Sequence, residues 1–464
     1  MCNKSNDEID ILFINPRDLS APAPYIRLAQ LSSVLAENQL TSKIIEPAAS
    51  RVSHSEIIKQ IGQCKPAVIC LGVFPSTLPD ANKTVIAIRK FYPDIPLVLE
   101  GYQVNADPNA VLEIGADYGI RGDTEYCFLC LCKSLVKGEE PPEDLSGLLI
   151  NRQGKLIINP PAFIEEINDL PIPDYGKLPL GKYFSASTNK KYMTVFTARG
   201  CPYDCNFCAS AAQMKYRCLT EDNVMRHLRH LVAELGVEWI EFMDLTFTIS
   251  KKRVTAICER IGKAGLNFDW GCETRADLID DELLNVMKKA GCKKITIGVE
   301  AGSETIRFAT GKKISNEKFI RAFSLCRKHG IKTMANFIFG HPGEREEEMR
   351  ETIRFALDLK PFNILFTRMV PLPDVEIFQQ GVVEGRIDKA IWYRYMREEV
   401  DFPLYYPETI EKKRMDALYR SAYLRFYLSR RTILNYLPLF TDLVFFIKSI
   451  FIFFRLTFGK TIYK

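Results

Sequence analysis

Three cysteines lie close together near the middle of the chain, in the segment Ala-Arg-Gly-Cys-Pro-Tyr-Asp-Cys-Asn-Phe-Cys-Ala. Cys201, Cys205 and Cys208 are separated by four and three positions, and glycine, proline and polar residues surround them. A tetrahedral zinc site needs a fourth Cys or His at a nearby spacing, and none follows in the sequence. Three thiolates instead suit an iron–sulfur cluster that leaves one iron open for an exogenous ligand. The segment therefore predicts a cluster-binding loop.

The overall composition restricts the kind of protein that carries this loop. Its 464 residues, of which 26% are charged and 11% aromatic, predict a globular chain of two to four domains. The polar start shows no secretory signal peptide, so we expect a cytoplasmic protein whose 14 cysteines are reduced thiols or metal ligands. A formal net charge of +5 is too small to indicate nucleic acid as a partner.

Short apolar runs alternate with amphipathic stretches in residues 1–140. This alternation predicts a doubly wound, Rossmann-like parallel sheet with helices on both faces, and therefore an α/β fold. The predicted strands are 10–15, 42–46, 67–73, 96–101 and 118–122. Ligands of such sheets bind beyond the carboxyl ends of the strands, so we expect a binding site in the loops that follow them.

The remainder of the chain divides into three further segments. Residues 141–190 contain seven prolines and a predicted hairpin that turns near Gly154, as expected of an interdomain linker. Residues 191–400 resume the alternation as six strand–helix units, which predicts a partial (β/α)6 barrel with the cysteine loop after its first strand. Residues 401–464 are predicted to be a basic, aromatic-rich helical segment.

The cysteine loop resembles that of the radical S-adenosylmethionine (SAM) enzymes, whose hallmark is Cys-x3-Cys-x2-Cys after the first barrel strand. The resemblance covers about residues 190–400 and implies that Cys201, Cys205 and Cys208 hold a 4Fe–4S cluster. In that family the open iron binds the amino and carboxylate groups of SAM, and reduction cleaves SAM to methionine and a deoxyadenosyl radical. The resemblance also implies an external electron donor such as flavodoxin or ferredoxin.

Residues at the ends of later strands match further features of that family. The SAM contacts implied by the resemblance are Phe207, Ile338 and Gly340 at the adenine, Asp244 at the amino group, Arg275 at the substrate carboxylate and Glu300 at the ribose hydroxyls. Each polar residue also has a structural alternative, because Asp244 and Glu300 can cap helices and Arg275 can pair with Asp277 or Glu273. No residue is identified as catalytic.

A doubly wound domain ahead of such a barrel resembles the cobalamin-binding subfamily of these enzymes. The cobalamin contacts implied by this resemblance follow the strands of the first domain, and they are Ser76, Thr77, Gly101, Gln103 and Gly122. The chain lacks Asp-x-His-x-x-Gly, so no histidine is expected below the cobalt. Residues 100–103 read Glu-Gly-Tyr-Gln where relatives usually have a second glycine and a histidine. Ser76 and Thr77 are also expected to cap the following helix.

These resemblances imply a cobalamin-dependent enzyme that methylates an unactivated carbon of an apolar or natural-product small molecule. One alternative is a radical cyclase, or another C–C bond-forming or rearranging enzyme, that acts on a lipid or tetrapyrrole without methyl transfer. The alternative from another class is an iron–sulfur redox or binding protein, against which the matching SAM-site residues argue.

The C-terminal segment is basic and apolar. Residues 409–464 carry eleven Lys and Arg against three acids, so the rest of the chain is slightly acidic. Within 437–458, Asp442, Lys448 and Arg455 recur every six or seven positions, close to one helical face. This pattern predicts a helix that lies peripherally on the inner face of the membrane, where it would favour a lipid-like substrate, or else packs on the open side of the barrel.

Overall fold

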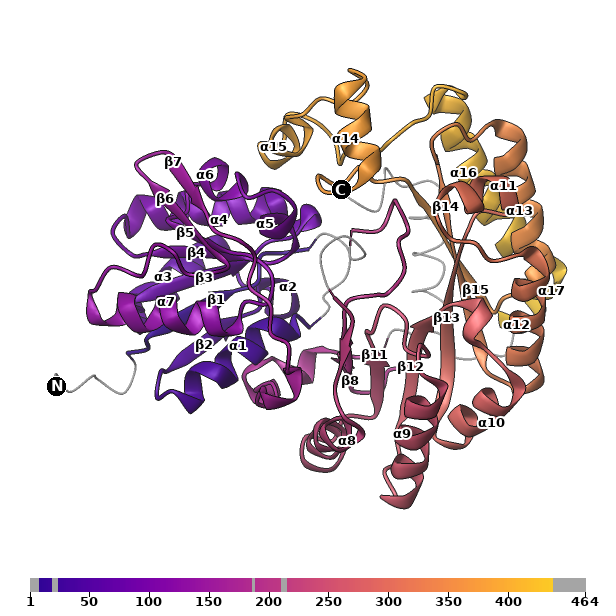
Figure 1. The fold of residues 1–464 in the computed structure, drawn as a ribbon, viewed down its shortest axis with the longest axis horizontal. Helices are drawn as coiled ribbons and strands as arrows, with labels where there is room; N and C mark the ends of the chain where they lie inside the picture. Colours follow the sequence, from indigo (N-terminus) through magenta and orange to yellow (C-terminus); the bar gives the residue numbers. More distant parts are fainter. Residues whose placement is uncertain (1–7, 19–23, 186–187, 210–214, 437–464) are drawn as a thin grey trace. The chain divides into compact units, whose positions relative to one another are not determined.

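The computed structural model describes residues 8–18, 24–185, 188–209 and 215–436. These residues form two compact units, and each unit is drawn in Figure 1 in the colours of its sequence position. The first unit takes the described parts of residues 1–184 together with 372–374 and 378–402, and the second takes those of 185–371, 375–377 and 403–464.

The first unit contains a seven-stranded sheet in the order β2-β1-β3-β4-β5-β6-β7. The first five strands are parallel, as predicted, and the hairpin predicted near Gly154 continues this sheet as two antiparallel strands (Figure 1). The strands are β1 (Ile11–Ile14), β2 (Ser42–Ile45), β3 (Val68–Gly72), β4 (Leu97–Glu100), β5 (Tyr118–Ile120), β6 (Leu148–Arg152) and β7 (Lys155–Ile158).

Helices cover both faces of this sheet. The helices of this part of the chain are α1 (Ile26–Glu37), α2 (Pro47–Ser50), α3 (His54–Cys64), α4 (Leu78–Phe91), α5 (Tyr102–Ala106), α6 (Ala110–Ile114) and α7 (Glu125–Lys137). Helix α1 packs on α7, whereas α3 and α6 pack on α4. Every residue of β1, β3 and β4 is buried, as expected for parallel strands that are covered on both sides.

The second unit contains a six-stranded, all-parallel sheet in the order β15-β14-β13-β12-β11-β8, which confirms the predicted six-unit partial barrel. Its strands are β8 (Tyr192–Val195), β11 (Trp239–Phe242), β12 (Asp269–Thr274), β13 (Cys292–Glu300), β14 (Lys332–Phe339) and β15 (Asn363–Arg368). Two short strands, β9 (Ala198–Arg199) and β10 (Arg217–Cys218), form a separate antiparallel pair. The helices between the barrel strands are α8 (Glu221–Arg229), α9 (Lys251–Lys263), α10 (Asp281–Lys289), α11 (Glu304–Ala309), α12 (Asn316–Lys328) and α13 (Glu346–Leu359).

An ion pair fills part of the inner face of the barrel. Nζ of Lys294 on β13 lies 2.8 Å from Oε1 of Glu241 on β11. Gly271 on the strand between them leaves room for this pair, because a Cβ there would lie 2.8 Å from Oε2 of Glu241. The opposite face of the same strands is apolar, with Phe242 edge-on to Trp270 beneath the helices. One face of these strands therefore carries a charged pair, and the other is apolar.

In the described part of the chain, four helices follow the last barrel strand. They are α14 (Glu376–Val383), α15 (Ile391–Met396), α16 (Lys412–Tyr427) and α17 (Arg430–Tyr436). Among the described residues, none of the helices is both long and apolar enough to cross a bilayer. The interfacial helix predicted within 437–458 lies outside the described residues.

The segment 378–402 belongs to the first unit although it follows the barrel strands in sequence. Helix α15 packs on α4, and Trp392, Tyr395 and Phe402 are buried against one another with their rings edge to face. An ion pair between Lys83 of α4 and Glu398, 2.7 Å apart, flanks this aromatic cluster. The first unit is therefore completed by a distant part of the chain.

We expect Phe402→Ala to loosen the first unit without affecting the barrel. Phe402 is 8% exposed and contacts both other rings of the cluster, so its truncation should cost about 3 kcal/mol. Hydrogen–deuterium exchange should show faster exchange in α4 and α15 and unchanged exchange in β12 and β13. The exposed Lys389→Ala serves as the control, and unchanged exchange in α4 of the Phe402 variant would contradict this role.

Candidate active site

The entry to the cysteine loop is fixed by a buried carboxylate. Asp244 follows β11 and is 2% exposed. Its Oδ1 accepts hydrogen bonds from the backbone N–H groups of Thr197 (2.5 Å) and Ala198 (3.0 Å), and its Oδ2 accepts one from the Thr197 hydroxyl. From the other side, Arg253 donates to the Thr197 carbonyl at 2.9 Å. These bonds hold the chain between β8 and β9 at the carboxyl end of the barrel.

This geometry gives Asp244 a task besides the predicted contact with the SAM amino group, which stays a prediction. Both of its oxygens accept hydrogen bonds from the protein itself. Burial raises the pKa of Asp244, and the bonds from Thr197 and Ala198 oppose that rise. Asp244 therefore positions the start of the cysteine loop, and its bonds to Thr197 and Ala198 cap no helix.

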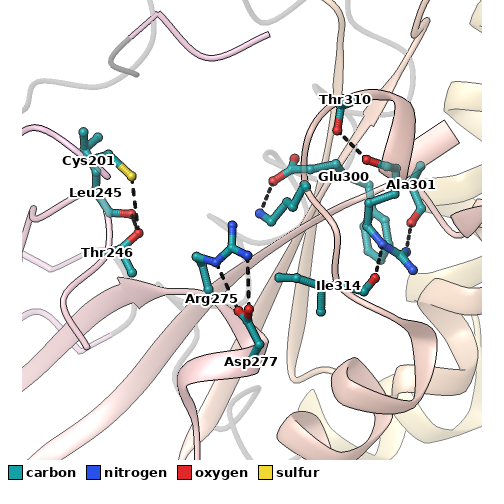
Figure 2. Close-up of polar contacts among 12 residues, drawn as sticks. Cys201, Leu245, Thr246, Arg275, Asp277, Glu300, Ala301, Thr310 and Ile314 are labelled. Atoms are coloured by element: carbon teal, nitrogen blue, oxygen red, sulfur yellow. Dashed lines mark hydrogen bonds and ion pairs between the residues drawn. The ribbon is translucent and has the colours of Figure 1, made fainter. Parts of the chain in front are cut away.

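The cysteine side chains lie in an irregular, partly exposed loop. The Cys208 N–H donates to the Cys205 carbonyl at 3.0 Å, which folds these two residues into a turn. Figure 2 shows the Cys201 sulfur directed toward the Thr246 hydroxyl, 3.9 Å away, which in turn donates to the Leu245 carbonyl. None of these three cysteines is part of a disulfide, so their sulfur atoms remain thiols.

The segment between α11 and α12 supports the middle of the cysteine loop. Asn206 donates through its backbone N–H to the Thr310 carbonyl at 3.1 Å. Gly311 packs so closely that a Cβ there would lie 2.6 Å from the Asp204 carbonyl. The following residue, Lys312, lies 2.8 Å from the Glu300 carboxylate (Figure 2). Backbone contacts with this segment thus hold the loop that carries the thiols.

Glu300 occupies a strained position at the end of β13. Its φ is +66°, which is uncommon for a residue with a side chain, and the register between β13 and β14 shifts at this point. Such a bulge redirects a side chain, and here the carboxylate turns to Lys312. The alternative that Glu300 caps a helix is not what the structure shows, because its hydrogen bond goes to the Lys312 side chain.

Arg275 adopts the alternative expected from the sequence. Its guanidinium donates from Nε and Nη2 to the two oxygens of Asp277, each at 3.1 Å (Figure 2). The same group stacks on the Tyr203 ring, with 3.7 Å between Cζ and the ring centroid. Because Tyr203 lies between the first two cysteines, Arg275 joins the end of β12 to the cysteine loop.

Phe207 meets the turn that follows β14. Its ring lies edge-on to the His341 ring, with 6.0 Å between the centroids. Gly340, whose φ is +94°, begins this turn, and the Glu344 carboxylate accepts hydrogen bonds from the Gly340 and His341 N–H groups at 2.8 and 3.1 Å. The predicted adenine-side residues are therefore brought to one place next to the loop.

The charges around the cysteines are of both signs. Burial raises the pKa of Cys205 to about 11. The thiol of Cys208 and the carboxylate of Glu300 also raise this pKa, whereas the cations Lys312 and Arg275 lower it. Within the described part of the chain, no three Cys, His, Asp or Glu side chains gather closely enough to hold a single metal ion. Each cysteine of an iron–sulfur cluster binds a different iron, so a cluster does not require its three thiols to meet at one point.

In the first unit, a polar cluster lies at the carboxyl end of β4. Tyr25 donates to Oε2 of Glu100 at 3.0 Å, while Oε1 of Glu100 and both amide atoms of Gln103 are buried without a partner in the described structure. Gly101 has a φ of +108° and approaches the backbone of Val73, where a Cβ would lie 2.8 Å from the carbonyl oxygen. Gly101 and Gln103 thus lie at the sheet edge where a ligand was predicted.

The other predicted cobalamin contacts have structural partners. The Ser76 hydroxyl donates to Asp18 at 2.9 Å. The Thr77 hydroxyl accepts from the Phe74 N–H at 2.9 Å and so caps the short 3-10 helix Pro75–Thr77, whereas Thr77 makes no side-chain cap hydrogen bond to α4, so the expectation that it caps that helix is wrong. Gly122 pairs with Ala162, whose carbonyl oxygen would lie 2.0 Å from an added Cβ. Close backbone packing explains this glycine without a ligand.

Three residues at the barrel site were missed by sequence reasoning. Lys312 and Tyr203 contact predicted residues, and His341 directly follows the predicted residue Gly340 in sequence without having been selected. Lys312 had a usable signal, because it follows a glycine in the loop after α11. Tyr203 and His341 had none, since their roles depend on which strand ends meet in space.

Comparisons with known proteins identify one domain of the chain. Residues 195–356, which contain the cysteine loop and the strands β11 to β14, match the radical SAM superfamily. The chain carries a radical SAM domain. It is 29% identical over 424 residues to an uncharacterised methyltransferase of Pyrococcus horikoshii, with 90% of this chain and 91% of the relative covered.

Two further likenesses concern the whole chain. It is 27% identical to the anaerobic magnesium-protoporphyrin IX monomethyl ester cyclase of Rubrivivax gelatinosus, over 90% of this chain and 78% of the cyclase. The structure of OxsB, a cobalamin-dependent SAM radical enzyme with aqua-cobalamin and SAM bound, matches with a TM-score of 0.72 at 17% identity, over 98% of this chain and 74% of OxsB. The latter likeness confirms the predicted fold class.

We expect Asp244→Asn to weaken both the fold and the loading of iron. In the wild type, the Thr197 and Ala198 N–H groups donate to a carboxylate, whereas the variant offers them a neutral amide oxygen or an NH2 group. We expect the free energy of unfolding to fall by about 2 kcal/mol. Thermal unfolding and iron content per chain after anaerobic reconstitution measure the two effects. Asp269→Asn is the matched control, because Asp269 begins the neighbouring strand β12 at the amino end of the barrel, and this variant should retain its iron. Equal iron content in both variants would argue against a positioning role.

Glu100 should make the first unit less stable as the pH rises. Burial raises the pKa of Glu100 from its ordinary 4.5 to about 7, so its contribution is complete below pH 4.5 and lost as the pH rises through 7. The change is on the order of 3 kcal/mol. Glu100→Gln should remove this part of the pH dependence, measured by exchange protection of β3 and β4 between pH 5 and 8. The pKa of Glu46 is also raised to about 7, so part of the pH dependence should remain in the Gln variant. Parallel profiles of the wild type and the Gln variant would contradict this assignment.

Proposed function

We propose that this radical SAM enzyme is cobalamin-dependent and methylates an unactivated carbon of an apolar small molecule. Two observations together carry the proposal. The three-cysteine loop is held in place by hydrogen bonds and close backbone packing, and the first unit has buried polar atoms without a partner in the described structure at the end of β4. When bound, a 4Fe–4S cluster with SAM supplies a radical that abstracts hydrogen, and cobalamin supplies the methyl group. The protein residues bind these groups, orient them and exclude water.

The thiol loop fits a cluster through its chemistry and its support. Cys201, Cys205 and Cys208 are the three donors, and one iron of a cubane held by them stays open for SAM. The loop is fixed at its entry by Asp244 and at its middle by the segment at Gly311. Rigid support of this kind keeps three donors at the separations that a preformed cluster requires.

The residues around the loop suit the groups of SAM. Lys312 and Arg275 are cations that lower the pKa of Cys205, so they lie close enough to attract a carboxylate. Oδ1 of Asn336, on β14, is buried without a partner in the described structure and suits a ribose hydroxyl. We propose Glu300 as a second ribose contact, with Phe207, Ile338 and Gly340 beside the adenine.

The first unit fits cobalamin at the edge formed by Gly101 and Gln103. The unsatisfied amide of Gln103 and the unpartnered oxygen of Glu100 suit the amide-rich rim of a corrin, because the Gln103 amide can donate and accept and the Glu100 oxygen can accept. Gly101 lets the loop approach β3 closely. Ser76, Thr77 and Gly122 would contact the ligand through backbone atoms, since their side chains or Cβ positions serve the fold.

Apolar side chains at the barrel mouth support an apolar substrate. Phe196 follows β8, and Met243 and Leu245 follow β11; their exposures are 47%, 38% and 40%. The Met243 N–H donates to the Val195 carbonyl, so the two strand ends are adjacent. Leu245 precedes Thr246, whose hydroxyl contacts Cys201. An exposed apolar group beside a cluster ligand is a suitable surface for an aliphatic or macrocyclic substrate.

A second candidate is a radical cyclase or rearranging enzyme, favoured by the 27% identity to the Rubrivivax gelatinosus cyclase. It would use the same thiol loop and SAM contacts. A flavodoxin or ferredoxin would supply the electron in either case, and peripheral contact with a membrane through 437–458 would suit a lipid-like substrate.

One anaerobic experiment distinguishes these functions. The protein is reconstituted with iron, sulfide and cobalamin, and SAM and a reductant are added. Bound corrinoid with both deoxyadenosine and S-adenosylhomocysteine is the result expected of the methyltransferase. Deoxyadenosine without S-adenosylhomocysteine favours the cyclase, and the absence of both products overturns both candidates.

Cys205→Ala should abolish cluster loading and SAM cleavage, because two thiols cannot hold the cubane with one open iron. Iron and sulfide content and deoxyadenosine formation are the measurements. Cys130→Ala is the matched control, since Cys130 is an exposed thiol on α7. Unaltered SAM cleavage in Cys205→Ala would overturn the assignment of the loop.

A further inference from the structure

The end of α16 and helix α17, residues 425–436, form a surface that we call the α17 corner. It presents three large aliphatic side chains to solvent, because Leu428, Ile433 and Leu434 are 62%, 45% and 56% exposed. The Ser429 hydroxyl accepts the Thr432 N–H at 3.3 Å and so caps the start of α17. Leu428 and Ile433 flank this cap at positions that lie side by side at a helix start. The aliphatic groups are therefore neighbours on one surface.

The α17 corner is also basic. Residues 417–436 contain four arginines and no acidic residue. Arg425 lies on the last turn of α16, Arg430 begins α17, and both are exposed. The two helices therefore provide no acid of their own that could neutralise these arginines.

The neighbouring helix α12 adds positive charge rather than an acid. Burial lowers the pKa of Arg431, and the like charge of Arg327 on α12 lowers it further, so the two guanidinium groups lie near each other. Figure 1 draws α17 beside α12. Arg327 donates to the Leu359 carbonyl at 2.7 Å, and Nη1 of Arg431 is buried without a partner in the described structure. Two neighbouring guanidinium groups without an acid favour the binding of a phosphate.

The last residue of α17 adds an aromatic group of the kind found at lipid–water interfaces. The half-buried Tyr436 ring stacks on Phe362 with 5.4 Å between the centroids, and Nζ of Lys332 lies 4.3 Å from the Phe362 centroid. Tyrosine and lysine side chains combine an apolar body with a polar end, which suits such an interface. Lys332 begins β14 and Phe362 directly precedes β15, so this surface lies at the amino end of the barrel strands. The cysteine loop lies at the opposite end.

We propose that the α17 corner docks on the surface of an anionic phospholipid bilayer. The aliphatic groups enter the boundary of the acyl chains, and the arginines bind the lipid phosphates. An acidic protein would match the arginines, but the three adjacent aliphatic groups favour a bilayer. Docking through the amino end of the barrel leaves the cysteine loop uncovered, so it is independent of the reaction at that loop. It also extends the contact proposed for 437–458 to a surface of the barrel itself.

Co-sedimentation of the full-length protein with vesicles tests this docking. We expect binding to vesicles that contain phosphatidylglycerol, weaker binding at high salt, and little binding to pure phosphatidylcholine. The double variant Ile433→Ser/Leu434→Ser should bind the anionic vesicles at least about tenfold more weakly. Arg425→Gln/Arg430→Gln should lose about fivefold for each charge removed. All four side chains are exposed, so thermal unfolding should be unchanged.

Matched controls carry the same kinds of change elsewhere. Ile86→Ser/Val383→Ser removes two aliphatic groups that are 60% and 86% exposed, and Lys252→Gln/Lys263→Gln removes two exposed charges from α9. Both controls should bind as the wild type does.

Hydrogen–deuterium exchange in the presence of anionic vesicles locates the contact. Exchange should slow in residues 425–436 and stay unchanged in α9. The proposal is overturned if the wild type does not prefer anionic vesicles, or if slower exchange is confined to other residues. It is also overturned if the Ser double variant binds as tightly as the wild type, and a loss in the Gln double variant alone would then indicate a surface for an acidic protein.

Discussion

The hydrogen bonds from Thr197 and Ala198 to the Asp244 carboxylate are the constraint on which the active site depends. A loop with three cysteines has no regular structure of its own. Partial burial of the thiols does not order it either, because burial disfavours the charged thiolate, as the raised pKa of Cys205 shows. A buried carboxylate that accepts three bonds fixes the start of the loop. Once this end is fixed, the contacts of Asn206 with Thr310 and the close approach of Gly311 set the rest of its path.

Fixing the loop in this way also determines how charge is distributed around it. The carboxylate of Asp277 neutralises Arg275, and Glu300 neutralises Lys312, so that neither cation is buried alone. Both pairs lie beside the thiol loop, where an incoming carboxylate could compete with the protein's own acid. Exchange of one carboxylate partner for another costs less than burying a bare cation, which suits a site that must bind and release a zwitterionic ligand.

The sequence was sufficient to predict the elements but not their partners. Strands of the first sheet and the six barrel strands follow from apolar runs of four to nine residues, and the cysteine loop follows from its spacing. The role of Asp244 in positioning the loop could not be predicted, because a carboxylate after a strand is equally suited to a ligand and to a neighbouring backbone, and its bonds with Thr197 depend on how the strand ends meet in space. The same holds for 378–402, whose aromatic residues gave no sign that they complete the first unit rather than continue the barrel.

Buried polar groups without partners show where ligands belong in both units. In a folded protein such groups are rare because each costs about 1–3 kcal/mol. Among the described residues, Glu100 and Gln103 lie at the end of β4, and Asn336 and His341 lie on β14 and the turn that follows it. These are carboxyl ends of parallel strands, where helices do not close over the sheet and ligands of α/β folds bind. Buried polar atoms without a partner in the described structure also occur elsewhere, as at Arg431 on α17. It is therefore the position of these four side chains, toward the carboxyl ends of parallel strands, that points to ligands.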